Sequence, residues 1–407
     1  MERSRCSHYL GSVDKARNVS KRQSTKALLA IGVIAITIAL TGYVYLQNQT
    51  HPPNRPQEPE GPFPYIVEEV SFKNEEAQTT LSGTLTLPFD ANGKYPAVVL
   101  ISGSGPQNRD GEWMGHKPFL IIADYLTRKG IAVLRYDDRG FGKSTGDFHS
   151  GTSLDFSTDV ESAVEFLKTR DEIDTEKIGL IGHSDGAMIA PMVAVRSADI
   201  SFIVMLAGPG ILGSELMVRR QEFMERRAGK TEPEIQQSKK YIEEVIKIVI
   251  NSTDENSLRV ALETFAHKTI DQIPEDQIPP GMSKEEFISR QVAQLTSPWF
   301  KFFFKYDPQE HLRKVKCPVL ALTGDKDVQA PAADNLEAIK SGLQSGGNSH
   351  VTIKELKGIN HMMQECTTGM MDEYARIDQT LSPRVLDEIS RFVLAQSIAT
   401  ASQLHEP

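Results

Sequence analysis

Three residue types that together can activate a hydroxyl group occur at separate points of this chain. Ser184 lies in GHSDG at 182–186, which fits the pattern G-x-S-x-G. A serine hydroxyl is a poor nucleophile until an imidazole takes its proton, and that imidazole needs a carboxylate to fix its tautomer. Where the pattern forms a sharp strand-to-helix turn, the acid and then the histidine follow the serine along the chain. We therefore predict Ser184 as a nucleophile with both partners downstream.

Two downstream loops supply the acid and the base. The loop GDKDV at 324–328 follows an apolar run and carries Asp327, the predicted acid, with Asp325 as the alternative. The loop KGINH at 357–361 follows the next strand-like run and presents His361, the predicted base. Open α/β sheets place their functional groups at the carboxyl ends of strands. The serine, the acid and the histidine thus follow one another in the order that favours a catalytic triad. We predict that the remaining histidines are structural.

Context distinguishes Ser184 from a second match to the same pattern, GKSTG at 142–146. Ser184 follows the apolar run 178–181 and precedes a helix-like segment, which is the setting that the turn requires. Ser144 has neither flank, because it follows polar residues and leads into DFH. We therefore predict that Ser144 lies in a loop.

The negative oxygen of a tetrahedral intermediate needs N–H donors that are fixed in advance. We predict one donor from the backbone of Asp185 and others from the loop SGSGP at 102–106, which follows a strand-like run. Ser104 and Gly105 are the candidates in that loop, because Pro106 has no N–H group. The alternative for this loop is a plain glycine turn.

No cofactor or metal is expected. GPGILG at 208–213 fits G-x-G-x-x-G, but Pro209 removes an amide donor from a loop that would have to present several, and no second strand-helix-strand unit follows it. No group of His, Cys, Asp or Glu has the spacing of metal ligands. Three cysteines are too few for a disulfide framework, and a bridge between Cys317 and Cys366 is left open.

The periodicity of the chain predicts a mostly parallel, doubly wound α/β sheet. Segments 67–73 and 80–87 alternate apolar and polar residues, which is typical of an antiparallel strand pair. Helical patterns at 119–129 and 157–167 lie between later strands. Those later strands are short continuous apolar runs, as expected for strands buried on both faces, at 97–101, 131–136, 178–181, 202–206, 319–323 and 351–356. The strand pattern stops between Gly208 and about Tyr306, where helical, charged segments predict an all-helical cap insertion. The aromatic run at 299–306 either lines an acyl pocket or packs against the sheet.

A membrane segment is predicted at 27–46, where twenty uncharged and mostly apolar residues would span roughly 30 Å as a helix. Seven basic residues in 1–26, against two acidic ones, predict a cytoplasmic N-terminus and an extracytoplasmic body in a single-pass cell-membrane protein. We favour this uncleaved anchor over a cleaved signal peptide, because the apolar stretch is long and no A-x-A site follows it. The Pro-rich segment 51–64 is expected to be an extended tether.

The net charge of −9 comes from the part of the chain beyond this basic tail, and an acidic body argues against a nucleic-acid groove. The oligomeric state is left open. The expected organisation is a basic tail (1–26), a transmembrane helix (27–46), a Pro-rich linker (47–64), a first part of the α/β core (65–207), a helical cap insertion (208–306), a second part of the core (307–398) and a tail (399–407).

Several motifs together resemble the prokaryotic α/β-hydrolase esterases that are related to serine aminopeptidases and acyl hydrolases. They are ISGSGPQNRDGE (101–112), GHKPF (115–119), LRYDDRGFGKSTGDF (134–148), GLIGHSDGAMIAP (179–191), CPVLALTGDKDVQAP (317–331) and GINHMMQ (358–364). The resemblance implies the α/β-hydrolase fold, with Ser184 as nucleophile, Asp327 as acid and His361 as base. It also implies hydrolysis of small-molecule carboxylic esters with short acyl chains, without a cofactor. Two positions depart from the family's pattern: Ser102 stands where many members have His, and Asp185 stands where relatives often have Glu or another residue.

The expected function is therefore that of a membrane-anchored serine esterase that works through an acyl-enzyme intermediate. A triad by itself does not choose between esters and amides, so a serine peptidase or amidase on the same fold is one alternative. A catalytically silent binding module is the other, because a fold alone does not establish an activity.

Overall fold

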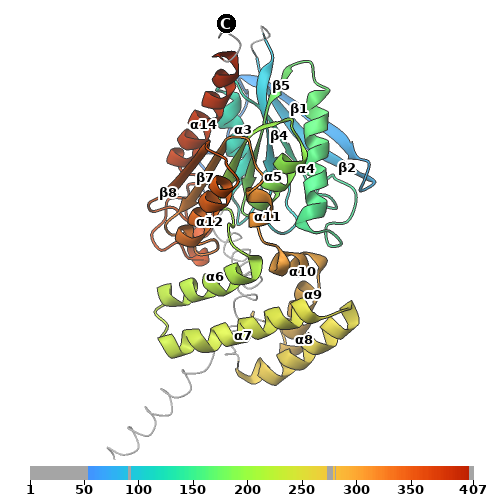
Figure 1. The fold of residues 1–407 in the computed structure, drawn as a ribbon, viewed down its shortest axis with the longest axis vertical. Helices are drawn as coiled ribbons and strands as arrows, with labels where there is room; N and C mark the ends of the chain where they lie inside the picture. Colours follow the sequence, from blue (N-terminus) through green and yellow to red (C-terminus); the bar gives the residue numbers. More distant parts are fainter. Residues whose placement is uncertain (1–53, 90–92, 273–277, 280, 403–407) are drawn as a thin grey trace, which may run out of the picture. The chain divides into compact units, whose positions relative to one another are not determined.

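A computed structural model describes residues 54–89, 93–272, 278–279 and 281–402 (Figure 1). Within these ranges the chain forms two compact units. The helical unit comprises Met224–Thr296, and the core unit comprises the described residues up to Phe223 together with those from Ser297 onward. The predicted membrane segment lies outside the described residues. In the ranges that are described, no helix is both long and apolar enough to cross a bilayer.

One sheet of eight strands, in the order β1-β2-β4-β3-β5-β6-β7-β8, forms the centre of the core unit (Figure 1). The strands are β1 (Tyr65–Asn74), β2 (Thr79–Pro88), β3 (Tyr95–Ile101), β4 (Ala132–Tyr136), β5 (Ile173–His183), β6 (Ile200–Leu206), β7 (Val319–Gly324) and β8 (Val351–Leu356). β1 pairs antiparallel with β2, and β2 with β4, whereas all later neighbours are parallel. The mostly parallel α/β sheet predicted from the sequence is thus confirmed.

Helices on both faces explain why the inner strands are continuous apolar runs. On one face, α4 (Ser153–Lys168), α5 (Asp185–Arg196) and α12 (Ala332–Ser345) contribute Val160, Ile189 and Ile339 to one hydrophobic cluster with the sheet (Figure 1). On the other face, α3 (Pro118–Thr127) and α14 (Pro383–Ser402) contribute Ile122 and Val385 to a second cluster. Strands between two such layers bury both sets of side chains, so every residue of β4 and of β7 is buried.

The chain between β6 and β7 is helical in its described parts. It contains α6 (Gly213–Arg227), α7 (Glu232–Asn251), α8 (Glu255–Thr269), η1 (Ile270–Gln272), α9 (Lys284–Leu295), α10 (Pro298–Lys305) and α11 (Gln309–Leu312). In the helical unit, α7 buries Ile242, Val245 and Val249, which recur at the spacing of one helix face. The Ser238 hydroxyl of the same helix donates to Glu225 at 2.7 Å in the interior of that unit.

Part of the Pro-rich segment contacts the core unit, although an extended tether was expected there. The Arg55 guanidinium donates to the backbone carbonyls of Gly115 and Ile377, both at 2.8 Å. The Gln57 side chain donates to the carbonyl of Leu381 at 2.8 Å. Proline-rich composition predicts a backbone without regular structure, but it does not reveal side-chain hydrogen bonds to residues more than 300 positions away.

Candidate active site

Ser184 occupies a strained turn between β5, which ends at His183, and α5, which begins at Asp185. Its backbone has φ 55° and ψ −113°, and positive φ is costly for any residue with a Cβ. The two glycines of the motif make the turn possible. A Cβ on Gly182 would collide with the backbone of Gly186, and a Cβ on Gly186 would collide with the carbonyl oxygen of Ile101. The turn therefore fixes the serine at the carboxyl edge of the sheet.

Asp327 and His361 form a buried hydrogen-bonded pair in the loops after β7 and β8. His361 Nδ1 lies 2.8 Å from Asp327 Oδ2, and both side chains are almost fully buried. Asp327 Oδ1 accepts the N–H groups of Gln329 and Ala330, each at 2.8 Å. Because Oδ2 is directed at Nδ1, the carboxylate can hold the imidazole with Nε2 as the atom that exchanges protons.

Asp325, the alternative acid, faces a different partner. Its Oδ1 accepts the backbone N–H of Gly358 at 2.7 Å, which joins the loop after β7 to the loop after β8. This hydrogen bond helps to place the segment that presents His361. Of the two aspartates, Asp327 is therefore the one whose carboxylate the structure brings to the imidazole.

His183 connects the serine turn to the loop of His361. Its Nε2 lies 2.8 Å from the backbone carbonyl oxygen of His361, and the two imidazole rings are 5.0 Å apart. Since a carbonyl only accepts, Nε2 of His183 carries the hydrogen. Burial and the neighbouring His361 lower the pKa of His183 to about 4, so this ring is neutral at pH 7. Within the described ranges, the Ser184 hydroxyl itself makes no hydrogen bond, so the structure pairs two of the three predicted triad residues directly.

The loop after β3 lies against the serine turn. A Cβ built on Gly103 would stand 3.4 Å from Ser184 Cβ, which places this loop beside the nucleophile. In the part of the chain that the structure describes, the backbone N–H groups of Ser104, Gly105 and Asp185 donate to no acceptor. The three predicted oxyanion donors are therefore available to a ligand.

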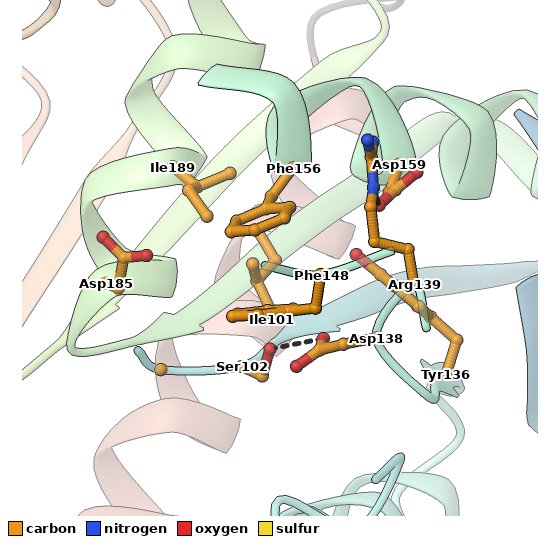
Figure 2. A pocket seen from close by; sticks show the side chains of 11 residues that line it. Ile101, Ser102, Tyr136, Asp138, Arg139, Phe148, Phe156, Asp159, Asp185 and Ile189 are labelled. Atoms are coloured by element: carbon orange, nitrogen blue, oxygen red, sulfur yellow. Dashed lines mark hydrogen bonds and ion pairs between the residues drawn. The ribbon is translucent and has the colours of Figure 1, made fainter. Parts of the chain in front are cut away.

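Asp138, which sequence reasoning did not single out, holds this loop (Figure 2). The Ser102 hydroxyl donates to Asp138 Oδ1 at 2.7 Å, and the Gln107 backbone N–H donates to Oδ2 at 2.8 Å. Burial raises the pKa of Asp138 to about 7, although both hydrogen bonds favour the ionised form. The motif DDRG at 137–140 was visible in the sequence, but its partner loop lies about 30 residues away and only the fold brings them together.

A small cavity lies behind these loops, lined by Ser102, Asp138, Phe156, Asp185 and Ile189 among others (Figure 2). Its volume is ≈ 10 Å³, which is room for about one water molecule and not for a substrate. Ser184 is not among its lining residues. The cavity therefore lies among the residues that hold the loops after β3 and β4 in place, and it is not a substrate pocket.

The Asp185 side chain lines this cavity and is held by donors from two other elements. Its carboxylate accepts the Ser153 hydroxyl at 2.9 Å and the Trp299 indole N–H at 3.1 Å. Burial raises the pKa of Asp185 to about 6, while these two donors favour the ionised form. Trp299 stacks on Phe303 with ring centroids 4.9 Å apart, and Phe303 is itself buried. Of the two interpretations of the aromatic run at 299–306, these contacts favour packing in the core over lining an acyl pocket.

Ser144 and the glycine-rich segment after β6, which the sequence analysis did not assign to a site, both make hydrogen bonds that hold the fold together. The Ser144 hydroxyl is buried, donates to the Asp137 carbonyl at 2.6 Å and accepts the Ser82 N–H at 2.9 Å, so it joins a loop to β2. The backbone N–H of Gly210, in the glycine-rich segment after β6, donates to the Asn335 side chain at 2.8 Å. Cys317 and Cys366 are both free thiols.

Comparisons with known proteins support the α/β-hydrolase fold. Residues 117–278 match the profile of the family described as serine aminopeptidase, S33. The chain is 27% identical over 338 residues to esterase EstD of Thermotoga maritima, an alignment that covers 82% of this chain and 70% of that protein. It is 29% identical over 164 residues to thiohydrolase apmlB of Arthrinium phaeospermum, covering 39% and 49% of the two chains. Among solved structures, esterase PF2001 of Pyrococcus furiosus superposes with a TM-score of 0.51 at 16% identity, covering 84% of this chain and 98% of that one.

Proposed function

We propose that this chain, which has the α/β-hydrolase fold and is similar to esterases, cleaves carboxylic esters with Ser184 as the nucleophile, His361 as the general base and Asp327 as the acid. The observation that carries the assignment is the buried hydrogen bond of 2.8 Å between Asp327 and His361. The strained backbone of Ser184, in the turn that precedes α5, supports the role of the nucleophile. The resemblance to esterases supports esters as the substrate class.

The proposed reaction uses the general chemistry of a Ser-His-Asp triad. His361 Nε2 takes the Ser184 proton while the serine oxygen attacks the ester carbonyl carbon, and Asp327 stabilises the resulting imidazolium. The N–H groups of Asp185 and of the loop at 102–106 would donate to the negatively charged oxygen. His361 then gives its proton to the departing alcohol, which leaves an acyl group on Ser184. A water molecule, deprotonated by His361, attacks this acyl group, and His361 gives that proton to the serine oxygen as the acid is released.

We also propose that short acyl chains are preferred, which the likeness to esterases supports. The test is a series of 4-nitrophenyl esters from acetate to dodecanoate. The expected result is a maximum of kcat/KM at the short end of the series. A maximum at the long end would contradict this preference without affecting the assignment of the triad.

Labelling with a fluorophosphonate, followed by peptide mass mapping, tests the nucleophile without assuming a substrate. We expect modification at Ser184, with labelling lost in Ser184→Ala and strongly reduced in His361→Ala. Removing a triad residue lowers turnover by factors on the order of 10⁴ or more. Ser144→Ala is the matched control, because Ser144 lies in the same sequence pattern but hydrogen-bonds to backbone groups. Unchanged labelling in folded Ser184→Ala would refute the assignment, and no labelling of the wild type would favour a binding module.

Amide hydrolysis is the second candidate, and the family description of the matched profile favours it. A triad does not by itself distinguish an ester from an amide. Turnover of a 4-nitrophenyl ester and of an aminoacyl 4-nitroanilide should be compared on the same preparation. We expect the ratio of kcat/KM for the ester to that for the anilide to exceed the ratio of their uncatalysed hydrolysis rates. A kcat/KM for the anilide that equals or exceeds that for the ester would assign the chain as a peptidase.

We further propose a single-pass membrane protein anchored by 27–46, with the N-terminus in the cytoplasm and the catalytic body outside. The length of the apolar stretch and the basic residues before it support this topology. Protease added to intact spheroplasts should degrade the body and spare the first residues. Protection of the body under those conditions would contradict the orientation, and an intact mass lacking about 45 residues would show a cleaved signal.

A further inference from the structure

His361 lies in a short hairpin, residues 358–366, which a buried pair of polar residues closes. The Asn360 backbone N–H donates to the Gln364 carbonyl at 3.0 Å, and the Gln364 N–H donates to the Asn360 side-chain oxygen at 3.0 Å. The two side-chain amides are also joined, because the Asn360 nitrogen donates to Gln364 Oε1 at 2.9 Å. Both residues are fully buried. This pair therefore fixes the turn that carries His361, here called the His361 hairpin.

The segment 379–382 holds the His361 hairpin by further hydrogen bonds. The Gln364 amide nitrogen donates to the Gln379 carbonyl at 3.0 Å, and the Ser382 backbone N–H donates to the Met363 carbonyl at 2.8 Å. The Gln379 side-chain oxygen accepts another backbone N–H of the hairpin at 2.9 Å. Met363 has a backbone φ of 61°, a conformation that is costly for a residue with a Cβ and persists only where its surroundings hold it. These contacts supply that support.

The chain that precedes β1 holds the segment 375–381 in turn. Gln57 Oε1 accepts the backbone N–H groups of Thr380 and Leu381 at 2.7 and 3.0 Å, and its amide nitrogen donates to the Leu381 carbonyl at 2.8 Å. The Arg55 guanidinium donates to two further carbonyls of the same segment, at 2.8 and 3.1 Å. Hydrogen bonds therefore connect Gln57, through this segment, to the His361 hairpin.

The motif GHKPF at 115–119 meets the same set of contacts. His116 is fully buried, and its two ring nitrogens lie 3.1 Å from the Thr380 hydroxyl oxygen and 2.9 Å from the Gln364 amide nitrogen. The carbonyl of the preceding glycine accepts from Arg55 at 2.8 Å. Buried polar groups that bind one another form a rigid support, because breaking one contact leaves a group unsatisfied away from water.

A general base must be held where it can take the serine proton, and a displacement of about 1 Å can lower a rate on the order of a hundredfold. We infer that Gln57 and Gln364 are positioning residues for His361, so that the chain before β1 is part of the support of the catalytic centre. Both act through the backbone of the His361 hairpin and not through contact with the substrate. The inference rests on the proposed function, because it takes His361 as the base.

The kinetic test is hydrolysis of 4-nitrophenyl acetate by the detergent-solubilised full chain. We expect Gln57→Ala to lower kcat about tenfold and Gln364→Met about a hundredfold, with KM nearly unchanged, because His361 acts in both acylation and deacylation. Gln57 is only partly buried, so Gln57→Ala tests the inference even if Gln364→Met does not fold.

Two further variants make the kinetic result specific. Glu58→Gln is the matched control, because Glu58 follows Gln57 directly but pairs with Lys117 at 2.8 Å, and its kcat should equal that of the wild type. Gln57→Glu should restore part of the activity lost in Gln57→Ala. A carboxylate still accepts the N–H groups of Thr380 and Leu381 and loses only the donor to the Leu381 carbonyl.

Proton NMR supplies a readout that a purely structural role would not change. The hydrogen on His361 Nδ1, which faces Asp327 at 2.8 Å between the heavy atoms, should resonate far downfield, and His361→Ala identifies the signal by its loss. We expect this signal to broaden or vanish in Gln57→Ala, at a temperature where thermal unfolding shows that the variant is folded. In Glu58→Gln the signal should match that of the wild type.

The outcomes separate this inference from the proposed function. An unshifted, sharp signal in folded Gln57→Ala would overturn the inference, and so would an unchanged kcat in that variant. A loss of activity that only follows the fraction of unfolded protein would show a structural role and would overturn it as well. If the wild type cleaved no ester, the proposed function would fail. The NMR comparison needs no substrate, so it would still report whether Gln57 helps to hold His361 against Asp327.

Discussion

At the scale of single residues, the surroundings of each carboxyl group decide its role. Asp327 accepts hydrogen bonds from His361 and from two backbone N–H groups, whereas Asp325 accepts the backbone N–H of Gly358. Burial raises the pKa of Asp138 to about 7 and that of Asp185 to about 6, from an ordinary value of 3.8. A carboxyl with a raised pKa binds more protons in the folded than in the unfolded chain, so these two groups make stability fall as the pH rises from about 4 to about 7.

The Trp299 indole should therefore stabilise the protein in a pH-dependent way. Trp299→Phe removes the N–H donor to Asp185, and a buried carboxylate needs this donor most when it is ionised. We expect a loss of about 1–3 kcal/mol of unfolding free energy at pH 8 and a smaller loss at pH 5, where Asp185 is protonated. Urea unfolding at both pH values measures the difference.

Trp113→Phe is the control for this experiment, because the Trp113 indole makes no hydrogen bond within the described ranges. Its effect should be the same at pH 5 and pH 8. A loss in Trp299→Phe that did not change with pH would mean that the indole contributes by packing alone.

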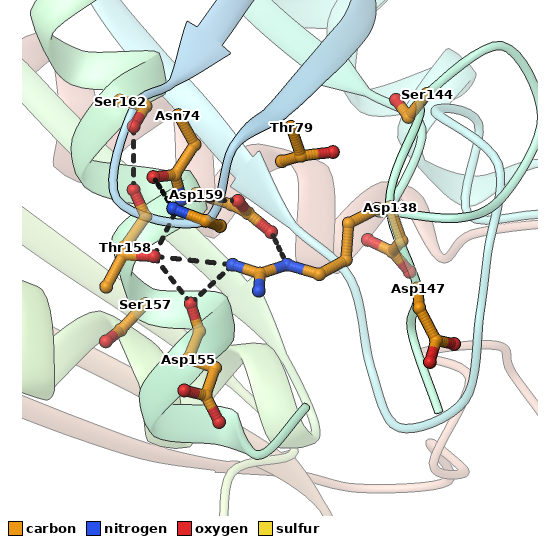
Figure 3. A network of polar contacts seen from close by, with 12 residues as sticks. Asn74, Thr79, Asp138, Ser144, Asp147, Asp155, Ser157, Thr158, Asp159 and Ser162 are labelled. Carbon is orange, nitrogen blue, oxygen red and sulfur yellow. Dashed lines mark hydrogen bonds and ion pairs between the residues drawn. The ribbon is translucent and has the colours of Figure 1, made fainter. Parts of the chain in front are cut away.

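At the scale of elements, a buried polar network fastens the end of β1 and the loop after β4 to α4 (Figure 3). Arg139 Nε donates to Asp159 Oδ2 at 2.6 Å, and the Asn74 side chain donates to Asp159 Oδ1 and to Thr158, each at 2.7 Å. Arg139 directly follows Asp138, which holds the loop beside Ser184. The network thus links an antiparallel edge strand to the support of the active site.

Asp159→Ala should be among the more destabilising substitutions in the core unit. It leaves the buried guanidinium of Arg139 without its counterion, which typically costs about 3–5 kcal/mol. Asp372→Asn breaks an exposed pair with Arg376 and should cost about 0–1 kcal/mol. Thermal or urea unfolding of both variants provides the comparison. Equal, small losses would show that water reaches the Arg139 site.

At the scale of the whole molecule, the core unit is assembled from two separated stretches of chain, with the helical unit between them. Ser184 lies before this insertion, and Asp327 and His361 lie after it. The sheet reunites them, because β6, which precedes the insertion, pairs with β7, which follows it. Arg55 and Gln57 attach the chain that precedes β1 to the same unit.

Removal of residues 1–53 should release the protein from membranes without loss of esterase activity. The shortened chain keeps Arg55 and Gln57, and it loses the apolar stretch at 27–46. We expect the full chain to remain in the membrane fraction after a carbonate wash and the shortened chain to be soluble, with similar kcat/KM. A full chain that is released by the wash would contradict the proposed anchor.

The sequence by itself predicted the strands in their order along the chain, the helical segments between β6 and β7, and Ser184 and His361 as triad candidates with Asp327 or Asp325 as the acid. Continuous apolar runs and their spacing are local properties, and the glycines around Ser184 reflect a turn formed by five consecutive residues. Only the tertiary structure showed that Asp327, rather than Asp325, is hydrogen-bonded to His361, and that Asp138 accepts hydrogen bonds from Ser102 and Gln107. These facts depend on burial and on hydrogen bonds between distant segments, and a hydrogen bond between segments far apart leaves no periodic trace in either of them.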